Sequence, residues 1–234
     1  RRGAAAAHQT SPVAAIERAH LRDLHGLKRS KPATGFAKAS IEDSIYHGAL
    51  QLNQHRLECL PIGEVNSASS LLHLLHPEQV LAFLASLPKF RTVCPTLLAL
   101  PLHAVVLPHC RPLHTLAVSA SLADALALLS GECLWALPLV DANGALVDVI
   151  SCRDARQLAV HGSLADMGGA RLDECLLALP PTPPRLQSCS AADTVEHIIT
   201  RLASSQVAQV IVLDERGAVA AVVTASDVLC SLVR

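Results

Sequence analysis

The feature that most constrains the fold is a pair of motifs that occurs twice in the second half of the chain. The aligned pairs are 136–144 (ALPLVDANG) with 209–217 (QVIVLDERG), and 150–154 (ISCRD) with 223–227 (VTASD). Gly217 follows Gly144, and Asp227 follows Asp154, by the same 73 residues. A repeat at fixed spacing indicates duplicated structural units, so this part of the chain is expected to fold as packed copies of one unit.

Local patterns predict the same element order in both copies: helix, strand, tight turn, strand, helix. In the middle copy these elements are expected at 121–129, 134–141, 142–144, 145–150 and 152–160, with Ser151 capping the last helix. In the last copy they are expected at 194–202, 208–213, 214–217, 218–223 and 226–232. The proline-rich stretch 179–184 between the two copies is predicted to be a linker.

A weaker upstream copy precedes these two. Its residues 40–45 and 59–62 correspond to 121–126 and 136–139, its strands are expected at 63–67 and 70–75, and its last helix at 78–85. Residues 11–28, before this copy, have the apolar spacing of an amphipathic connecting helix.

A two-stranded ribbon cannot bury both of its faces alone, so the copies are expected to pair about a pseudo-twofold axis. Such a pair leaves clefts where strand ends meet helix N-termini, and helix N-termini favour anionic ligands. The sequence therefore predicts an α/β fold made of α+β type units, with ligand clefts between paired copies.

Composition and motifs exclude several function classes. The net charge of −1 provides no basic field for nucleic acid, and no apolar run approaches the ~20 residues that span a membrane. The chain has no nucleophile elbow, P-loop or Rossmann glycine pattern, so we expect no enzyme activity and no catalytic residue. Eight cysteines without a CxxC motif are typical of free thiols in a reducing compartment, here the cytoplasm and also the nucleus.

Two further interpretations concern metal binding and the chain's start. His103, His109, Cys110 and His114 could be drawn as a metal site, but they lie in a proline-rich stretch without helical spacing, so no metal is expected. The chain does not begin with Met, and we interpret it as a fragment or a processed form.

Three sets of residues carry a resemblance to a known family. They are 54–60 with 76–84 and 87–90; 136–154; and 192–202 with 222–229. They look like the second, third and fourth repeats of a CBS-domain protein, and most resemble the γ subunit of AMP-activated protein kinase and its plant and fungal relatives. The resemblance implies tandem CBS repeats paired into Bateman modules, with the first repeat absent from this chain. The implied boundaries are 1–36 (connecting helix), 37–90 (degenerate second repeat), 91–165 (connector and third repeat) and 166–234 (fourth repeat).

In that family the clefts bind AMP, ADP or ATP, and an Asp at the start of each repeat's last helix holds the ribose hydroxyls. The resemblance places Asp154 and Asp227 at this position, with Ser151 and Thr224 three residues before them and Ser226 beside Asp227. The same residues also form two S/T-x-x-D patterns that are typical of helix capping. The two interpretations are compatible, because a cap can orient the carboxylate that a ribose meets.

The chain departs from the family at the basic His-Arg pair before the second strand. Those positions carry Glu58-Cys59, Glu132-Cys133 and Ala208-Gln209. A phosphate site without cations lacks charge-assisted hydrogen bonds. Arg153 and Arg201 are the remaining arginines that could face a phosphate, although a lone surface arginine usually does not.

The resemblance implies a non-catalytic regulatory subunit that senses adenine nucleotides and modulates a Ser/Thr kinase, with a kinase catalytic subunit and a β scaffold subunit as partners. The alternative is a CBS scaffold with degenerate nucleotide sites that serves as an assembly module. A third possibility is a CBS protein that binds another adenosyl ligand or regulates a transporter or redox protein.

Overall fold

The computed structural model describes residues 37–64, 71–110, 112–132, 134–161, 169–179, 186–204 and 209–233. All described residues belong to one compact unit, 37–234. The connecting helix expected at 11–28 lies outside the described residues, as does most of the linker expected at 179–184.

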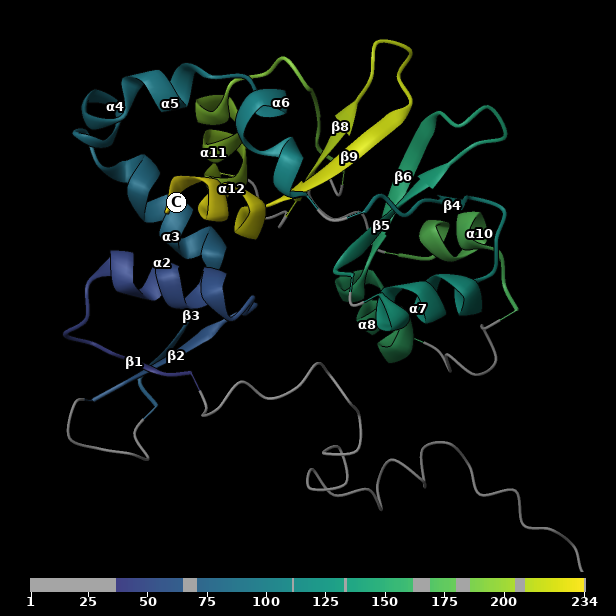
Figure 1. Cartoon of the computed structure of the whole chain (residues 1–234). Helices are drawn as coiled ribbons and strands as arrows, with labels where there is room; N and C mark the ends of the chain where they lie inside the picture. The colour runs from purple at the N-terminus through teal and green to yellow at the C-terminus, as the bar shows by residue number, and fades with distance from the viewer. Residues whose placement is uncertain are drawn as a thin grey trace, which may run out of the picture. The chain divides into compact units, whose positions relative to one another are not determined.

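Each copy contains a three-stranded sheet with the same topology (Figure 1). The first strand pairs parallel with the second, and the second pairs antiparallel with the third. The strands are β1 (Ala39–Ser40), β2 (Leu60–Gly63) and β3 (His73–Leu75) upstream, β4 (Leu116–Ala117), β5 (Ala136–Val140) and β6 (Leu146–Ser151) in the middle, and β7 (Ser188–Ser190), β8 (Gln209–Leu213) and β9 (Val219–Thr224) last. The short first strand of each sheet was not predicted, because two or three residues are too few to show a pattern of alternation.

Two helices accompany each sheet, in the predicted order. They are α2 (Ile45–Gln54) and α3 (Pro77–Ser86), α7 (Leu122–Gly131) and α8 (Cys152–His161), and α11 (Val195–Ser204) and α12 (Ala225–Leu232). The connecting segments contain α4 (Phe90–Val93), α5 (Pro95–Ala99), α6 (Leu102–Val105), the 3₁₀ helix η2 (Leu107–His109) and α10 (Leu172–Leu177). Within the described part of the chain, the helices lack the combination of length and apolar character that crossing a membrane requires.

The upstream copy differs from its prediction in register. Its first hairpin strand is β2 at 60–63, and residues 65–67 of the strand expected at 63–67 lie outside the described residues. Its helix α2 begins after Ser44, whose hydroxyl accepts the backbone N–H of His47 at 3.1 Å. Ser44, and not Ser40, is therefore the counterpart of Ser121, the N-cap of α7. Ser40 instead precedes a turn in which Asp43 accepts its backbone N–H at 2.7 Å.

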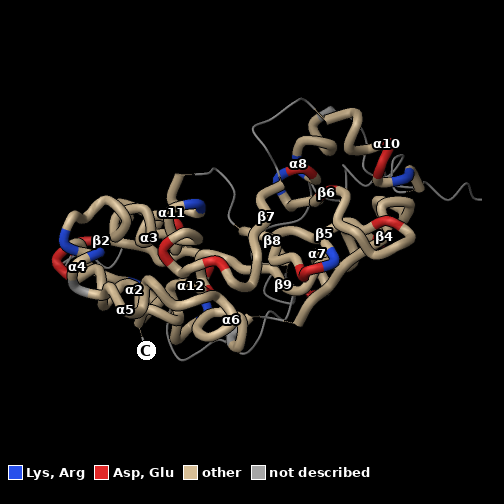
Figure 2. Tube along the Cα trace, turned by 90° about the horizontal axis from the view of Figure 1, so that it is seen from above, with Lys and Arg blue, Asp and Glu red and all other residues tan. Residues whose placement is uncertain are grey.

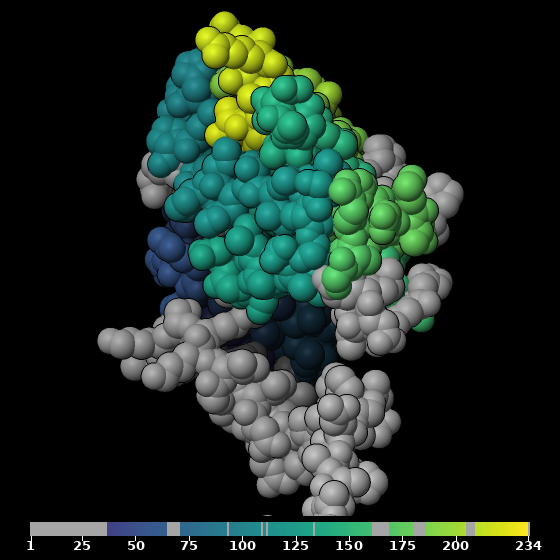
Figure 3. Space-filling view, turned by 90° about the vertical axis from the view of Figure 1, so that its right-hand side faces the viewer, coloured from purple at the N-terminus to yellow at the C-terminus, as the bar shows by residue number. Residues whose placement is uncertain are grey.

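The sheets of the middle and last copies pack against each other. Ala136 of β5, Val149 of β6 and Ile211 of β8 form one buried cluster. Because side chains alternate along a strand, the neighbours of Ile211 point the other way, and Val210 and Val212 lie in a different core. Figure 3 shows the residues of the middle copy, in teal, against those of the last copy, in yellow. This face-to-face packing confirms that the copies pair.

The helices of the last copy pack on those of the upstream copy. Val80 and Leu81 of α3 share a core with Ile198 of α11 and Val228 of α12, and all four are buried. The middle copy has a core of its own around α7, α8 and α10. The last copy therefore lies between two neighbours, one on its sheet and one on its helices.

The connecting segments α6 and α10, here called the lead-in segments, are exchanged between the middle and last copies. Leu102 at the start of α6 donates its backbone N–H to the carbonyl of Asp193 in the last copy, at 2.9 Å. Leu172 at the start of α10 donates its own to Ala120 in the middle copy, at 3.0 Å. Each lead-in segment thus binds the copy that it does not immediately precede, which is the pattern a pseudo-twofold axis produces.

The two hairpin turns are equivalent. Gly144 and Gly217 have φ angles of 80° and 79°, in the left-handed region that glycine adopts at little cost. Asp141 accepts the backbone N–H of Asn143 and Ala145 at 2.8 and 2.9 Å, and these hydrogen bonds lower the pKa of its carboxyl group. The predicted turn chemistry is confirmed in both copies.

Candidate functional site

The start of α12 is built by a reciprocal pair of side chains. Thr224, the last residue of β9, accepts the backbone N–H of Asp227 on its hydroxyl at 3.3 Å. The Asp227 carboxylate in turn accepts the backbone N–H of Thr224 at 2.8 Å and its hydroxyl at 2.6 Å, both on Oδ2. Ser226 lies between them and is exposed. The sequence-predicted capping role of Thr224 and Asp227 is confirmed.

The start of α8 has the same arrangement with a different exposure. Asp154 Oδ2 accepts the backbone N–H of Ser151 at 2.8 Å and its hydroxyl at 2.6 Å. Asp154 is only 4% exposed, whereas Asp227 is half-buried. The two predicted ribose positions are therefore unequal, because only Asp227 presents appreciable surface to a ligand.

The residue opposite each cap also differs between the copies. In the register of the hairpins, Gln209 pairs with Thr224, and Ala136 pairs with Ser151. Directly opposed residues place their side chains on the same face of a ribbon, with Cβ atoms about 5 Å apart. Gln209 is 8% exposed, and its Nε2 has no hydrogen-bond partner among the described atoms. From the sequence alone, Gln209 is notable only because it occupies a position where the family has a basic residue.

The stretch from α6 to Cys110 approaches α12, at Ser231 through Val105 and near Asp227 through Cys110. Burial, and then the negative charge of Asp227, raise the pKa of the Cys110 thiol to about 12. Ser231 of α12 donates its hydroxyl to the carbonyl of Val105 at 3.4 Å and to that of Asp227 at 3.0 Å. The site thus combines strand ends, a helix N-terminus and a segment that comes from before the middle copy.

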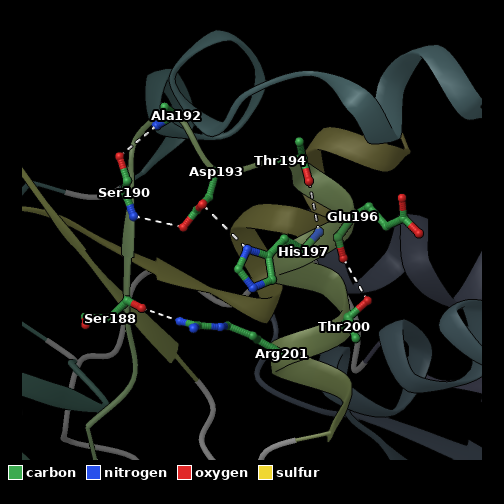
Figure 4. A network of polar contacts seen from close by, with 9 residues as sticks. All are labelled: Ser188, Ser190, Ala192, Asp193, Thr194, Glu196, His197, Thr200 and Arg201. Atoms are coloured by element: carbon green, nitrogen blue, oxygen red, sulfur yellow. Dashed lines mark hydrogen bonds and ion pairs between the residues drawn. The ribbon is translucent and has the colours of Figure 1, made fainter.

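The two arginines considered for phosphate binding are placed differently. Arg201 of α11 points to β7 and donates to the carbonyl of Ser188 (Figure 4). The same view shows Asp193, which accepts the backbone N–H of Ser190 at 3.0 Å in the turn before α11. Arg201 therefore holds a helix to a strand within the last copy. Arg153 is exposed on α8.

Acidic and basic positions are dispersed along the trace in the described part of the chain (Figure 2). The backbone carbonyl of Glu58 lies 3.2 Å from Nδ1 of His76. Oε2 of Glu132 lies 3.9 Å from Nε2 of His114. Cys133 and Ala208 lie outside the described residues. The described residues contain no group of three side chains that could hold a metal ion, and His103 has Nδ1 3.1 Å from the carbonyl of Ala191.

A family model for the CBS domain matches residues 107–161. This match identifies a CBS-domain segment within the chain. Residues 107–161 take in the middle copy and its cap at Asp154, and the last copy repeats the same topology. The predicted mixed α/β fold of paired CBS units is confirmed. Among curated protein sequences no match is found.

Solved structures with this fold span most of the chain. A protein from Methanocaldococcus jannaschii, named as a proposed archaeal homologue of γ-AMPK, aligns with a TM-score of 0.65 and 16% identity over 83% of this chain and 66% of its own length. An uncharacterised conserved protein from Pyrococcus horikoshii aligns with a TM-score of 0.62 and 16% identity over 85% of this chain and 79% of its own. CBSX2, crystallised in complex with AMP, aligns over 53% of this chain and 92% of its own, with 23% identity and a TM-score of 0.43.

The first two structures carry the comparison of folds. This chain spans just under two thirds of the Methanocaldococcus protein, so the likeness concerns the paired CBS units rather than that whole protein. These two structures therefore show that the chain shares its fold with the paired repeats of those proteins.

Proposed function

We propose that this protein is a non-catalytic regulatory subunit that binds an adenine nucleotide beside Asp227 and modulates a Ser/Thr kinase of the AMP-activated type. The observation that carries the proposal is the Thr224–Asp227 pair, which stands half-buried at the N-terminus of α12. A kinase catalytic subunit and a β scaffold subunit are the proposed partners. The repeats are proposed to span 37–90, 91–165 and 166–234.

The geometry of Asp227 suits a ribose. Both hydrogen bonds that its carboxylate accepts from described residues end on Oδ2, which leaves Oδ1 to accept from the two ribose hydroxyls. The exposed hydroxyl of Ser226 is adjacent and can donate or accept a further hydrogen bond. Capping fixes the carboxylate before the ligand arrives, so little conformational entropy is lost on binding.

The position of α12 provides a route for regulation. Its buried Val228 and Leu229 pack in the core that the last copy shares with the upstream copy. A ligand that binds one arrangement of α12 better than another would bias how these copies meet, and so bias any partner that contacts them. The seven described cysteines are free thiols, which agrees with action in the cytoplasm or nucleus.

The second candidate function is an assembly module without nucleotide sensing. The specific observation that favours it is the near-complete burial of Asp154, together with glutamates at two of the three basic positions, Glu58 and Glu132. Under this alternative, S/T-x-x-D pairs serve only to cap their helices.

Calorimetry and thermal shift with AMP, ADP and ATP test the proposal. A ligand at 100 times its Kd raises the free energy of unfolding by about 2.7 kcal/mol. We expect Asp227→Ala to abolish this response and to lower the stability of the free protein by about 1 kcal/mol through loss of the cap.

The matched control is Asp124→Ala. Asp124 caps α7 with Ser121 in the same way, accepting its hydroxyl at 2.6 Å, but it belongs to the first helix of a copy rather than the last. Its substitution should cost the same stability and leave nucleotide binding unchanged. If the folded wild-type protein responds to no nucleotide at millimolar concentration, the sensing proposal is wrong and the assembly module stands. Co-purification with a kinase and a β subunit tests the proposed partners.

A further inference from the structure

The amide of Gln209 is the described polar side chain that the fold leaves unexplained. Gln209 is 8% exposed, and its Nε2 has no partner among the described atoms. A buried donor without an acceptor is destabilising, because it has lost its hydrogen bonds to water and gained none in return. Such a group calls for an acceptor that the described residues do not provide.

The register of the last hairpin places this amide at the Asp227 site. Gln209 lies directly opposite Thr224, so the two side chains share one face of the ribbon. Thr224 is hydrogen-bonded to Asp227, and both are half-buried. Gln209 is more buried than either of these two residues.

The face is the one that meets the middle copy. Gln209 and Ile211 are two residues apart on β8, and Ile211 is buried against Ala136 and Val149. Gln209 therefore lies on the face of β8 that contacts the middle copy, at the start of the strand. In the middle copy the equivalent position is Ala136, opposite Ser151, and it offers no donor.

The chemistry of these groups favours an uncharged part of a ligand. An amide is a neutral donor, and hydrogen bonds from neutral donors are about half as strong as charge-assisted ones. The carboxylate of Asp227 adds a negative charge that disfavours a phosphate at the same place. A sugar with adjacent hydroxyls, followed by a neutral acceptor such as a ring oxygen or a base nitrogen, satisfies Asp227 and Gln209 together.

We infer that Gln209 donates a hydrogen bond to the nucleoside part of the ligand, so that the Asp227 site recognises the nucleoside and is insensitive to the number of phosphates. This inference rests on the proposed function, because it concerns the same ligand. It also assigns binding to the last copy, since the middle copy has Ala136 and a buried Asp154 in the same places.

The test compares adenosine, AMP and ATP by calorimetry on the wild type and two variants. The wild type should bind all three with dissociation constants within about threefold of one another. Gln209→Leu should weaken each by about three- to tenfold, the worth of one neutral hydrogen bond. The same variant should raise the Tm of the free protein, because it replaces an unpaired buried amide with an apolar group of similar size. Gln209→Lys should shift the preference toward ATP.

Ile211→Val is the matched control, because it alters packing on the same strand and face without changing a polar group. It should leave the three affinities unchanged. If the wild type binds and Gln209→Leu binds equally well, the role of Gln209 is refuted while the proposed function stands. A lower Tm with unchanged affinity would make the amide structural. Wild-type binding of ATP more than tenfold tighter than adenosine refutes nucleoside recognition, and no binding of any of the three overturns both proposals.

Discussion

The contact between the middle and last sheets can be measured by a double-mutant cycle on Val149 and Ile211. Ile211 is 1% exposed and belongs to the cluster between the two sheets. Ile211→Ala removes three carbon atoms, worth about 2.4 kcal/mol at ~0.8 kcal/mol each, and the cavity brings the loss to about 3–4 kcal/mol. Val149→Ala removes two carbons, for about 2 kcal/mol in all.

If the two side chains share one cavity, the double mutant should lose less than the sum. Residues in contact show interaction energies of about 0.5–3 kcal/mol, and we expect about 1 kcal/mol here. Urea unfolding at unchanged slope provides the free energies. Trp135, the chain's only tryptophan, directly precedes β5, so its fluorescence follows the middle copy when Ile211 in the last copy is changed.

Leu139→Ala is the control for this cycle. Leu139 is equally buried in β5 but belongs to the core on the other face, so its effect should add to that of Ile211→Ala within about 0.5 kcal/mol. An interaction energy for Val149 and Ile211 that is no larger than this control value would refute the face-to-face packing. The packing would also be refuted if the unfolding transition followed by Trp135 fluorescence were the same in Ile211→Ala as in the wild type.

Two further predictions concern the turns and the thiols. Gly217→Ala should lower the free energy of unfolding by about 1 kcal/mol, because the φ of 79° at this position disfavours a side chain. Gly131→Ala is the control, because Gly131 lies at the end of α7 with open space around it, and this change should be neutral or slightly stabilising. Urea unfolding of the two variants measures the difference. Cys110 and Cys189 have pKa values raised to about 12, chiefly by burial, so at pH 8 only about one part in 10⁴ is thiolate, and mass spectrometry should find both unalkylated by iodoacetamide until the protein is unfolded. Rapid alkylation of either thiol in the folded protein at pH 8 would contradict the burial that we describe.

The parts of the fold that sequence predicts are those set by local chemistry. Gly144 and Gly217 mark tight turns, and the caps at Thr224 and Ser151 follow from S/T-x-x-D spacing, because a few neighbouring residues determine each. The upstream copy was misplaced by four residues because both Ser40 and Ser44 resemble an N-cap, and only the turn that Asp43 closes separates them.

The unpredicted parts of the site depend on tertiary packing. The local sequence patterns around Asp154 and Asp227 are nearly identical, so they do not reveal that the first is buried and the second half-buried. The unpaired amide of Gln209 required the strand register, which pairs it with Thr224, and the packing that excludes water from it. Sequence identified which residues cap their helices, whereas the structure distinguished the half-buried carboxylate of Asp227 from the buried one of Asp154.

The exchange of the lead-in segments has a consequence for the order of folding. The backbone N–H of Leu102, at the start of α6, donates a hydrogen bond to the carbonyl of Asp193. During synthesis α6 leaves the ribosome long before Asp193, so this hydrogen bond cannot form until most of the chain has been made. Contacts of such sequence separation are slow to form. The middle copy needs α10 in the same way, so neither copy completes its own native contacts alone.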